Sequence, residues 1–433
     1  MAIFGMANTY YVSSSGNDDN SGLSESEAWQ TIEKVQYAVL QPGDIVLFEG
    51  GQTFTGMVSN ESLINGNLDQ PLTFGSYGIG KATITGTEIG FWVENTGNVI
   101  IKDLIFRGTN YLVTSIWSAG IYFWISPSAS ATVRTITVEN CEVFNYGGWG
   151  ILFGTESAVY GYDHIRVNDC LVHDNGIGGL HINGLWDSVA KRVKKLNTDV
   201  RFTNTKAYHN LGRYDYKDNW SGTGILMTGV NGGVIEHCEA YDNGKDNGST
   251  YAGPVGIFMG ESSYVTIQYC KSHNNSGGLG QRDGGGFDID GGTDNSVIQY
   301  CESYENDGAG YGLYQFQTRN PWTNDTIRYN KSTNDGRNTA IYGGITFWGI
   351  SSGYRVINAQ IYGNTINMDK PGTALMFLGS FLTNAQLYDN TFCLASPAVY
   401  SSKIPTTATV TNSIFPCGIL SIRKNSFSVR RIR

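Results

Sequence analysis

The chain has few charged residues and few prolines for its length of 433 residues. Asp, Glu, Lys and Arg together make up 15% of it, and only 9 residues are proline. Disordered chains show the opposite balance, so this composition predicts a folded protein. No run of 18 apolar residues is present, and we expect no membrane span. The formal net charge of −9 argues against a general nucleic-acid-binding protein.

The sequence also lacks the short motifs of several common enzyme and metal-binding classes. None of the 7 cysteines forms a CxxC pair, which argues against a zinc site or a thioredoxin-like site. The GxSxG, P-loop, HExxH and EF-hand patterns are absent too. The opening MAIFGMA has neither a basic region nor a long apolar core, unlike a signal peptide. We expect residues 1–8 to be a tag or leader remnant.

Glycine and aromatic residues are abundant, and they occur in a repeated unit. The chain contains 56 glycines, 26 tyrosines, 19 phenylalanines and 9 tryptophans, which is typical of a strand-rich protein with many turns. The unit is a short strand, one small or polar marker residue, a polar turn, and a glycine that opens a second short strand. The markers recur about every 31 residues, at Cys141, Cys170, Thr205, Cys238, Cys270, Cys301, Asn330, Asn364 and Asn390.

The repeated strands predict an all-β fold. They alternate with period two, as in GFDID, and lack the 3.6-residue pattern of helical repeats. A strand unit that cannot bury its own apolar face must stack on its neighbours, which a parallel β-helix allows. We therefore expect one β-helix domain over residues 9–392, in which the marker cysteines form a ladder of buried free thiols rather than disulfides.

The two ends of the predicted domain differ from the repeats. Trp29, Ile32, Val35 and Val39 have helical spacing, which predicts an amphipathic N-terminal capping helix over 27–39. After residue 392 the repeat fades, and the remaining segment contains six basic residues and no acidic one. We expect residues 393–433 to be a C-terminal cap or tail.

Two aspartates stand out on the second strands of the repeat. In GGGFDID the apolar Phe287 and Ile289 point inward, so Asp288 and Asp290 point outward together, about 6.6–7 Å apart along the strand. That separation lies within the roughly 6.5–9.5 Å expected between the acid and the base of an inverting glycosidase. Two such close carboxyls also raise one pKa, as a general acid requires. Asp283, in the preceding turn, is a third candidate.

Further candidates lie on the same outward face or in its turns. Arg282 is placed to neutralise a carboxylate or to bind a substrate acid group. Tyr314 and Trp348 offer flat rings on which a sugar can stack. His181 and Glu261 are candidate substrate-binding residues, and Glu261 or Glu156 offers an alternative partner for an acid/base pair. For each of them a purely structural role stays open.

The opening TYYVSSSGNDDNSG, the segment AWQTIEKVQ and the following QPGDIVLFEGGQTFTG resemble the start of many right-handed parallel β-helix proteins of the pectate-lyase-like superfamily. The stretch DGGGFDIDGGTDNSVIQYCESYENDGAGY is similar to segments of secreted bacterial β-helix proteins. The resemblance implies a right-handed β-helix and a secreted or periplasmic protein that acts on a polysaccharide. We also expect a monomer. That superfamily contains hydrolases, lyases, epimerases and non-catalytic adhesins.

Three functions are consistent with these residues. The first is a glycoside hydrolase in which Asp288 and Asp290 are acid and base, with Asp283 assisting and no cofactor. The second is a polysaccharide lyase, in which Asp283 and Asp288 would hold Ca²⁺ and Lys271 would be the base. The third is a non-catalytic glycan-binding β-helix that uses the aromatic residues alone.

Overall fold

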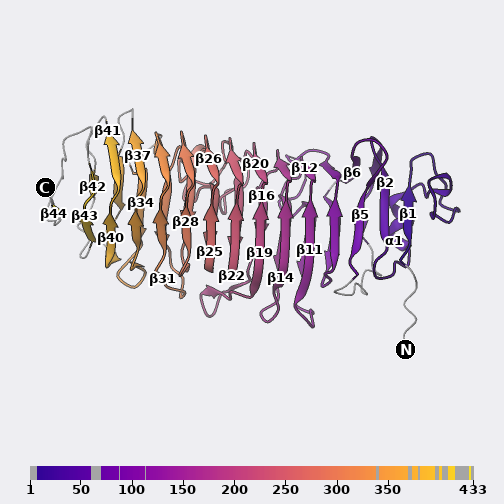
Figure 1. Ribbon diagram of the computed structural model, residues 1–433, viewed down its shortest axis with the longest axis horizontal. Helices are drawn as coiled ribbons and strands as arrows, with labels where there is room; N and C mark the ends of the chain where they lie inside the picture. The colour runs from indigo at the N-terminus through magenta and orange to yellow at the C-terminus, as the bar shows by residue number, and fades with distance from the viewer. Residues whose placement is uncertain are drawn as a thin grey trace. The chain divides into compact units, whose positions relative to one another are not determined.

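The computed structural model describes residues 7–59, 70–86, 88–112, 114–337, 341–368, 373–378, 381–394, 399–401, 408–414 and 429–430. The chain divides into two compact units. The first comprises residues 1–176 and 196–206, and the second comprises residues 177–195 and 207–433. Both are stacks of short parallel strands (Figure 1).

In the first unit each coil of chain contributes strands to three parallel sheets. One sheet contains β1 (Thr9–Val12), β2 (Ile45–Glu49), β5 (Leu72–Tyr77), β8 (Val99–Lys102), β11 (Val133–Glu139), β14 (Tyr162–Asn168) and β19 (Asn197–Thr203). The second contains β4 (Val58–Ser59), β7 (Ile89–Glu94), β10 (Ala119–Ile125) and β13 (Trp149–Thr155). The third contains β3 (Thr53–Thr55), β6 (Ala82–Gly86), β9 (Leu104–Gly108), β12 (Glu142–Phe144) and β15 (Leu171–His173).

The second unit repeats this arrangement. Its first sheet contains β22 (Val230–Glu236), β25 (Ser263–Gln268), β28 (Val297–Gln299), β32 (Thr326–Arg328), β36 (Gln360–Tyr362), β40 (Ala385–Tyr388), β43 (Ala408–Thr411) and β44 (Val429–Arg430). Its second sheet, here called the cleft sheet, contains β16 (Gly178–Ile182), β21 (Thr223–Thr228), β24 (Val255–Gly260), β27 (Gly285–Ile289), β30 (Tyr311–Gln315), β34 (Gly343–Gly349), β38 (Thr373–Leu378) and β42 (Val399–Ser401). Its third sheet contains β23 (Glu239–Tyr241), β26 (Lys271–His273), β29 (Glu302–Tyr304), β33 (Lys331–Thr333), β37 (Thr365–Met368) and β41 (Thr391–Leu394).

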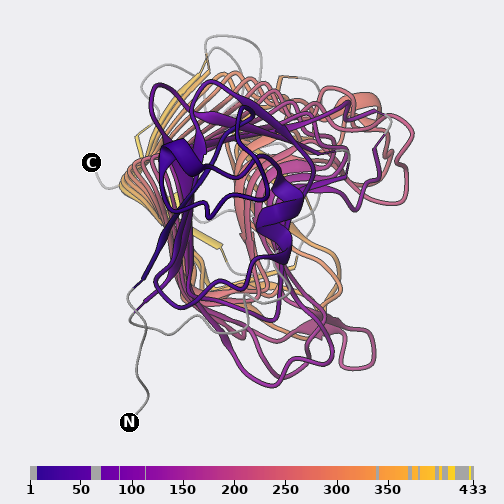
Figure 2. The same ribbon diagram turned by 90° about the vertical axis from the view of Figure 1, so that its right-hand side faces the viewer.

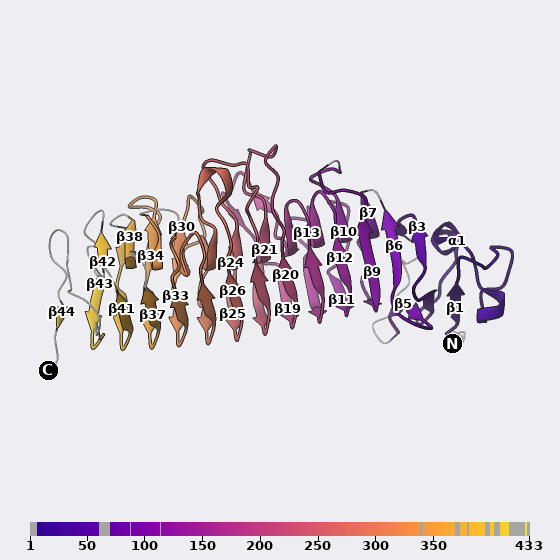
Figure 3. The same cartoon turned by 90° about the horizontal axis from the view of Figure 1, so that it is seen from above.

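Smaller elements complete the second unit. A short antiparallel pair joins β17 (Trp186–Asp187) to β18 (Arg192–Val193), and a small parallel sheet joins β31 (Trp322–Thr323), β35 (Val356–Ile357) and β39 (Leu382–Thr383). The strand β20 (Lys206–Tyr208) lies at the division between the units. The loops near β21 and β24 extend well beyond the strands, and a 3₁₀ turn lies at Gly278–Gly280 (Figure 3).

The interior of each unit is filled by the inward-facing residues of the strands. Within a unit, successive coils overlie one another when seen end-on (Figure 2). On the cleft sheet the two inward columns are almost completely buried, as the period-two alternation predicts; they include Ile225, Ile257, Phe287, Tyr311 and Ile345, then Met227, Met259, Ile289, Leu313 and Phe347. The predicted all-β, right-handed parallel β-helix is confirmed.

The marker residues form polar and thiol ladders inside the stack. Cys141, Cys170, Cys238, Cys270 and Cys301 are buried free cysteines, which confirms the prediction of thiols rather than disulfides. The asparagines that follow them have a different chemistry. Asn330 Oδ1 accepts a hydrogen bond from Cys301 N–H at 2.8 Å, and Asn364 Oδ1 accepts one from Asn330 N–H at 3.0 Å. Each amide therefore satisfies a backbone group of the coil before it.

The predicted capping helix over 27–39 is not confirmed. A 3₁₀ turn at Glu25–Glu27 precedes α1, which spans only Ile32–Tyr37. Trp29 lies outside α1, in a bridge to Val12 of β1, and Val39 is 71% exposed. The helix starts late because Asp18 accepts hydrogen bonds from the backbone of Gln30 and Thr31, and because the Thr31 side chain caps Lys34 N–H.

The domain boundaries inferred from the sequence stay predictions. Residues 1–6 of the predicted remnant lie outside the described residues. So do most of the basic residues of the predicted tail, namely Lys403, Arg423, Lys424, Arg431 and Arg433. No helix in the described part of the chain has the length and apolar character that crossing a membrane requires.

Candidate functional site

The register of the cleft sheet places the predicted residues on one face. Asp288 of β27 lies beside Phe258 of β24 and beside Gly312 of β30. Two residues further along, Tyr314 of β30 lies beside Trp348 of β34. This is the outward column predicted from the alternation, including its least regular coil, where glycine replaces a side chain. Both aspartates therefore project from the sheet in the same direction.

These outward side chains line a cleft of about 620 Å³ in the second unit. The sheet forms its floor, and the segments that precede β21, β24, β27 and β34 form its walls. Six residues predicted from the sequence line it: Arg282, Asp283, Asp288, Asp290, Tyr314 and Trp348. Several lining residues were missed by the sequence reasoning, above all Trp220, Tyr251, Phe316 and Tyr342. Most of these lie in loops that vary in length between coils, so the repeat carries no signal for them.

Asp288 is the most deeply buried carboxyl of the cleft. Its side chain points outward from the sheet, yet the residue is only 3% exposed because the surrounding walls cover it. Its Oδ1 atom is buried without a hydrogen-bond partner among the described residues. Burial raises the pKa of Asp288 well above its ordinary value, and the neighbouring charges of Asp290 and Asp283 raise it further. Asp288 therefore keeps its proton most strongly of the three.

Asp290 is held by the turn that follows β27. Its Oδ1 accepts a hydrogen bond from Gly291 N–H at 2.7 Å. Burial raises the pKa of Asp290 to about 7, the Gly291 hydrogen bond lowers it, and the charges of Asp283 and Glu261 raise it. A carboxyl with this pKa exists in both protonation states near neutral pH, which suits a residue that gives up a proton during turnover.

Of the three aspartates, Asp283 is the one whose ionised form is best stabilised by hydrogen-bond donors. Tyr342 O–H donates to Asp283 Oδ1 at 3.1 Å, and Gly253 N–H donates to Asp283 Oδ2 at 3.2 Å. Burial raises the pKa of Asp283 to about 6, while these two donors and the charge of Arg282 lower it. Tyr342 also accepts a hydrogen bond from the Asp283 backbone N–H at 2.9 Å, so one phenol holds both the main chain and the side chain.

Two other predicted substrate-binding residues lie outside the lining of the cleft. His181 Nε2 and Thr228 Oγ1 are 3.2 Å apart, and burial lowers the pKa of His181 to about 3, so the ring is neutral. Glu261 is 3% exposed and accepts hydrogen bonds from Asn320 Nδ2 at 2.5 Å and from Val193 N–H at 3.4 Å. The charge of Glu261 raises the pKa of Asp290, which does line the cleft.

The residues proposed for a calcium-dependent lyase are only partly brought together. Asp283 and Asp288 both line the cleft, but among the described residues no three His, Cys, Asp or Glu side chains are placed to hold a metal ion together. A carboxyl that retains its proton is also a poor ligand. Lys271 lies on β26 of another sheet, and Glu156 follows β13 in the first unit. Arg282 is the one basic residue among those that line the cleft.

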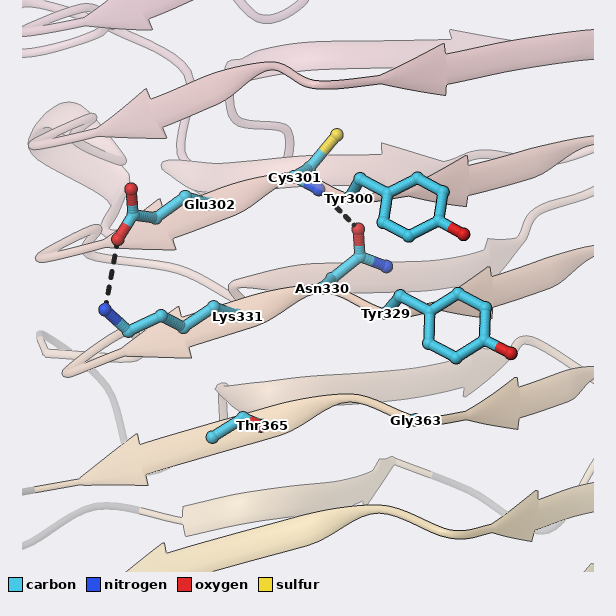
Figure 4. A pocket seen from close by; sticks show the side chains of 8 residues that line it. All are labelled: Tyr300, Cys301, Glu302, Tyr329, Asn330, Lys331, Gly363 and Thr365. Carbon is cyan, nitrogen blue, oxygen red and sulfur yellow. Dashed lines mark hydrogen bonds and ion pairs between the residues drawn. The ribbon is translucent and has the colours of Figure 1, made fainter.

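A second, shallower groove of about 450 Å³ lies on the third sheet of the second unit. Tyr300 and Tyr329 stack with their ring centroids 5.3 Å apart, and Lys331 Nζ lies 3.1 Å from Glu302 Oε1 (Figure 4). None of the predicted site residues lines this groove. Its charged and aromatic side chains pair with one another, which is the pattern of a stabilising ladder between coils.

Comparisons with known proteins agree with this fold. A family model described as "Right handed beta helix region" matches residues 191–366. A curated protein named lacto-N-biosidase, from Bifidobacterium longum subsp. longum, is 34% identical over 124 residues, which cover 25% of this chain and 8% of that protein. The chain thus matches only a small part of that relative's length.

Two solved structures have a similar course of the chain. The GH136 lacto-N-biosidase from Eubacterium ramulus superposes with a TM-score of 0.64 at 17% identity, covering 91% of this chain and 68% of that one. The A-module of a mannuronan C-5 epimerase from Azotobacter vinelandii gives a TM-score of 0.62 at 17% identity, covering 90% of this chain and 96% of that one. At these identities the likeness shows the β-helix fold, in agreement with the resemblance seen in the sequence.

Proposed function

We propose that this protein is a glycoside hydrolase that cleaves a glycosidic bond in the cleft above β27. The observation that carries the proposal is the gathering of Asp283, Asp288 and Asp290 in one aromatic-walled cleft, each with a raised pKa. Glycosidases need one protonated and one ionised carboxyl on either side of the scissile bond. The local 34% identity to a protein named lacto-N-biosidase supports the same class of reaction.

The surroundings of the aspartates suggest a role for two of them. Asp283 has two hydrogen-bond donors and loses its proton first, so it acts as the carboxylate that attacks the sugar or activates a water molecule. Asp290, with a pKa of about 7, donates a proton to the leaving oxygen. This assignment differs from the sequence prediction, in which Asp288 and Asp290 form the pair and Asp283 assists.

The walls of the cleft support a carbohydrate as the substrate. The aromatic residues Trp220, Tyr251, Tyr314 and Trp348 line the same cleft as the aspartates. Flat apolar rings pack well against the C–H faces of a sugar, while the carboxyls provide the polar contacts. Secretion and a monomeric state stay predictions.

The proposal is tested by measuring reducing-end release from a panel of polysaccharides and release of nitrophenol from 4-nitrophenyl lacto-N-bioside. Asp290→Asn and Asp283→Asn should each lower kcat by about 10²-fold or more, because general acid–base catalysis contributes roughly 10²–10⁴-fold. Asp242→Asn is a matched control, since Asp242 is exposed on a turn outside the cleft.

The other two functions give different results in the same assays. A lyase would release unsaturated products with ultraviolet absorbance and would lose activity with a chelator. A binding module would release no product while still retaining glycans. Full activity in both Asp283→Asn and Asp290→Asn would refute the proposed roles of these residues.

A further inference from the structure

Asp288 has a feature that the proposed reaction does not use. It lines the cleft, it is 97% removed from solvent, and its Oδ1 has no hydrogen-bond partner among the described residues. Leaving a buried polar atom unpaired is costly unless something else satisfies it. An unpaired polar atom that faces a cleft therefore indicates a contact that is made only when a ligand is bound.

The neighbouring coils explain why the protein itself supplies no partner. On one side the register places Phe258, whose ring has no donor or acceptor, beside Asp288. On the other side it places Gly312, which has no side chain. A Cβ atom on Gly312 would lie 2.9 Å from Asp288 Oδ1 and 2.7 Å from the ring of Tyr314. The Asp288 carboxyl and the Tyr314 ring therefore occupy the space that a side chain at position 312 would take.

The charge of the cleft restricts what can occupy it. Three carboxyls and only one guanidinium, that of Arg282, line the space. A uronate sugar would bring a further negative charge towards Asp283 and Asp290, whose burial leaves the repulsion poorly screened. A sugar unit without charge avoids this repulsion and still offers hydroxyl, ring and amide oxygens as acceptors.

We propose that Asp288 is a substrate-binding residue that donates its O–H to an oxygen of an uncharged sugar unit bound in the cleft. This inference deepens the proposed function and rests on it. It separates the three aspartates by role: Asp283 and Asp290 act on the scissile bond, and Asp288 binds an adjacent part of the substrate. The raised pKa of Asp288, caused first by burial, agrees with a carboxyl that keeps its proton.

The protonation of Asp288 can be tested without any turnover. Infrared difference spectra of the wild type minus Asp288→Asn at pH 7 should contain the carbonyl stretch of a protonated carboxylic acid. Adding lacto-N-biose, a neutral disaccharide, should shift that band, because the O–H acquires an acceptor. A difference spectrum that shows only carboxylate bands would overturn the inference.

Binding provides the second test. The fluorescence of the cleft residues Trp220 and Trp348 can follow titration of the full chain with a panel of neutral disaccharides and with digalacturonate. Asp288→Ala should weaken binding of the best neutral ligand by about 10-fold, and Asp288→Asn, which retains a donor, by about 3-fold, as the loss of one hydrogen bond predicts. Digalacturonate should bind more weakly than the neutral ligands.

The kinetic variants separate this inference from the proposed function. In turnover assays Asp288→Ala should act mainly through KM, whereas Asp290→Asn acts through kcat. A fall in kcat for Asp288→Asn as large as that for Asp290→Asn would overturn the inference and leave a hydrolase with different roles. Absence of turnover in the wild type, with the infrared band and neutral-sugar binding intact, would instead refute the proposed hydrolase. Tighter binding of digalacturonate than of any neutral ligand would also overturn the inference.

Discussion

Replacing Tyr342 by phenylalanine removes the hydroxyl that holds Asp283 without removing the ring. Two hydrogen bonds are lost, one donated to Asp283 Oδ1 at 3.1 Å and one accepted from Asp283 N–H at 2.9 Å. The first of these stabilises the ionised carboxylate. We therefore expect the variant to fold and to show an altered pH dependence.

The size of the effect follows from the strength of that bond. Hydrogen bonds to charged groups contribute about 1.5–3 kcal/mol, and one pKa unit corresponds to about 1.4 kcal/mol. Solvent entry into the space left by the hydroxyl offsets part of the loss, so we expect the pKa of Asp283 to rise from about 6 by about one unit. Because Asp283 works in its ionised form, the acidic limb of the kcat/KM profile should move to higher pH by the same amount.

The assay is the pH dependence of kcat/KM on a nitrophenyl glycoside, measured for the wild type and for Tyr342→Phe. Tyr311→Phe is a matched control, because Tyr311 is a buried tyrosine whose hydroxyl donates to the carbonyls of Cys301 and Lys331 at 2.9 Å and lies outside the cleft. It should lose stability in urea without a shift of the acidic limb. An unshifted limb in Tyr342→Phe, or equal shifts in both variants, would refute the role given to Asp283.

Three further predictions concern stability and packing. Because folding raises the pKa of Asp288, its contribution to stability is fully present below pH ~4 and is lost as the pH rises. Thermal melts should therefore show that the stability of Asp288→Asn increases relative to the wild type, by up to about 1.4 kcal/mol per pH unit above pH ~4. Gly312→Ala should lower kcat/KM by about 10²-fold, because a Cβ there displaces Asp288 and the ring of Tyr314, whereas Gly353→Ala, with nothing within 4 Å, should leave kinetics unchanged. Asn364→Ala should cost about 3 kcal/mol in urea unfolding, since it leaves Asn330 N–H without its acceptor. A loss below about 0.5 kcal/mol, which is typical of a surface substitution, would contradict the ladder.

The fold was largely predictable because it repeats. Each coil has the same alternation, so the neighbouring coils indicate which residues of an irregular coil face outward. Even the irregular pair Gly312 and Tyr314 has the predicted register. The length of the N-terminal helix was overestimated because its sequence pattern is not repeated elsewhere in the chain. The apolar spacing from Trp29 to Val39 occurs once. The hydrogen bonds that Asp18 accepts from the backbone of Gln30 and Thr31 hold this segment extended up to the start of the helix.

The candidate site was predictable only where it follows the strands. Asp288 and Asp290 could be placed outward from the alternation alone, and Asp283 from its position in the adjoining turn. Tyr342 could not be found in this way, because it contacts Asp283 from a segment 59 residues later in the sequence. The sequence suggested Asp288 and Asp290 as the acid/base pair with Asp283 assisting, whereas burial and hydrogen bonding favour Asp283 and Asp290.

The sequence by itself determined the parallel coils, the buried thiol ladder and the common face of two aspartates, because these depend on the repeat and on period-two alternation within each strand. Only the tertiary structure decided how deeply each carboxyl is buried and which donors reach it. Those properties arise where loops from different coils meet above the sheet, and they set the pKa of each group through desolvation and hydrogen bonding. The division of roles among Asp283, Asp288 and Asp290 depends on them.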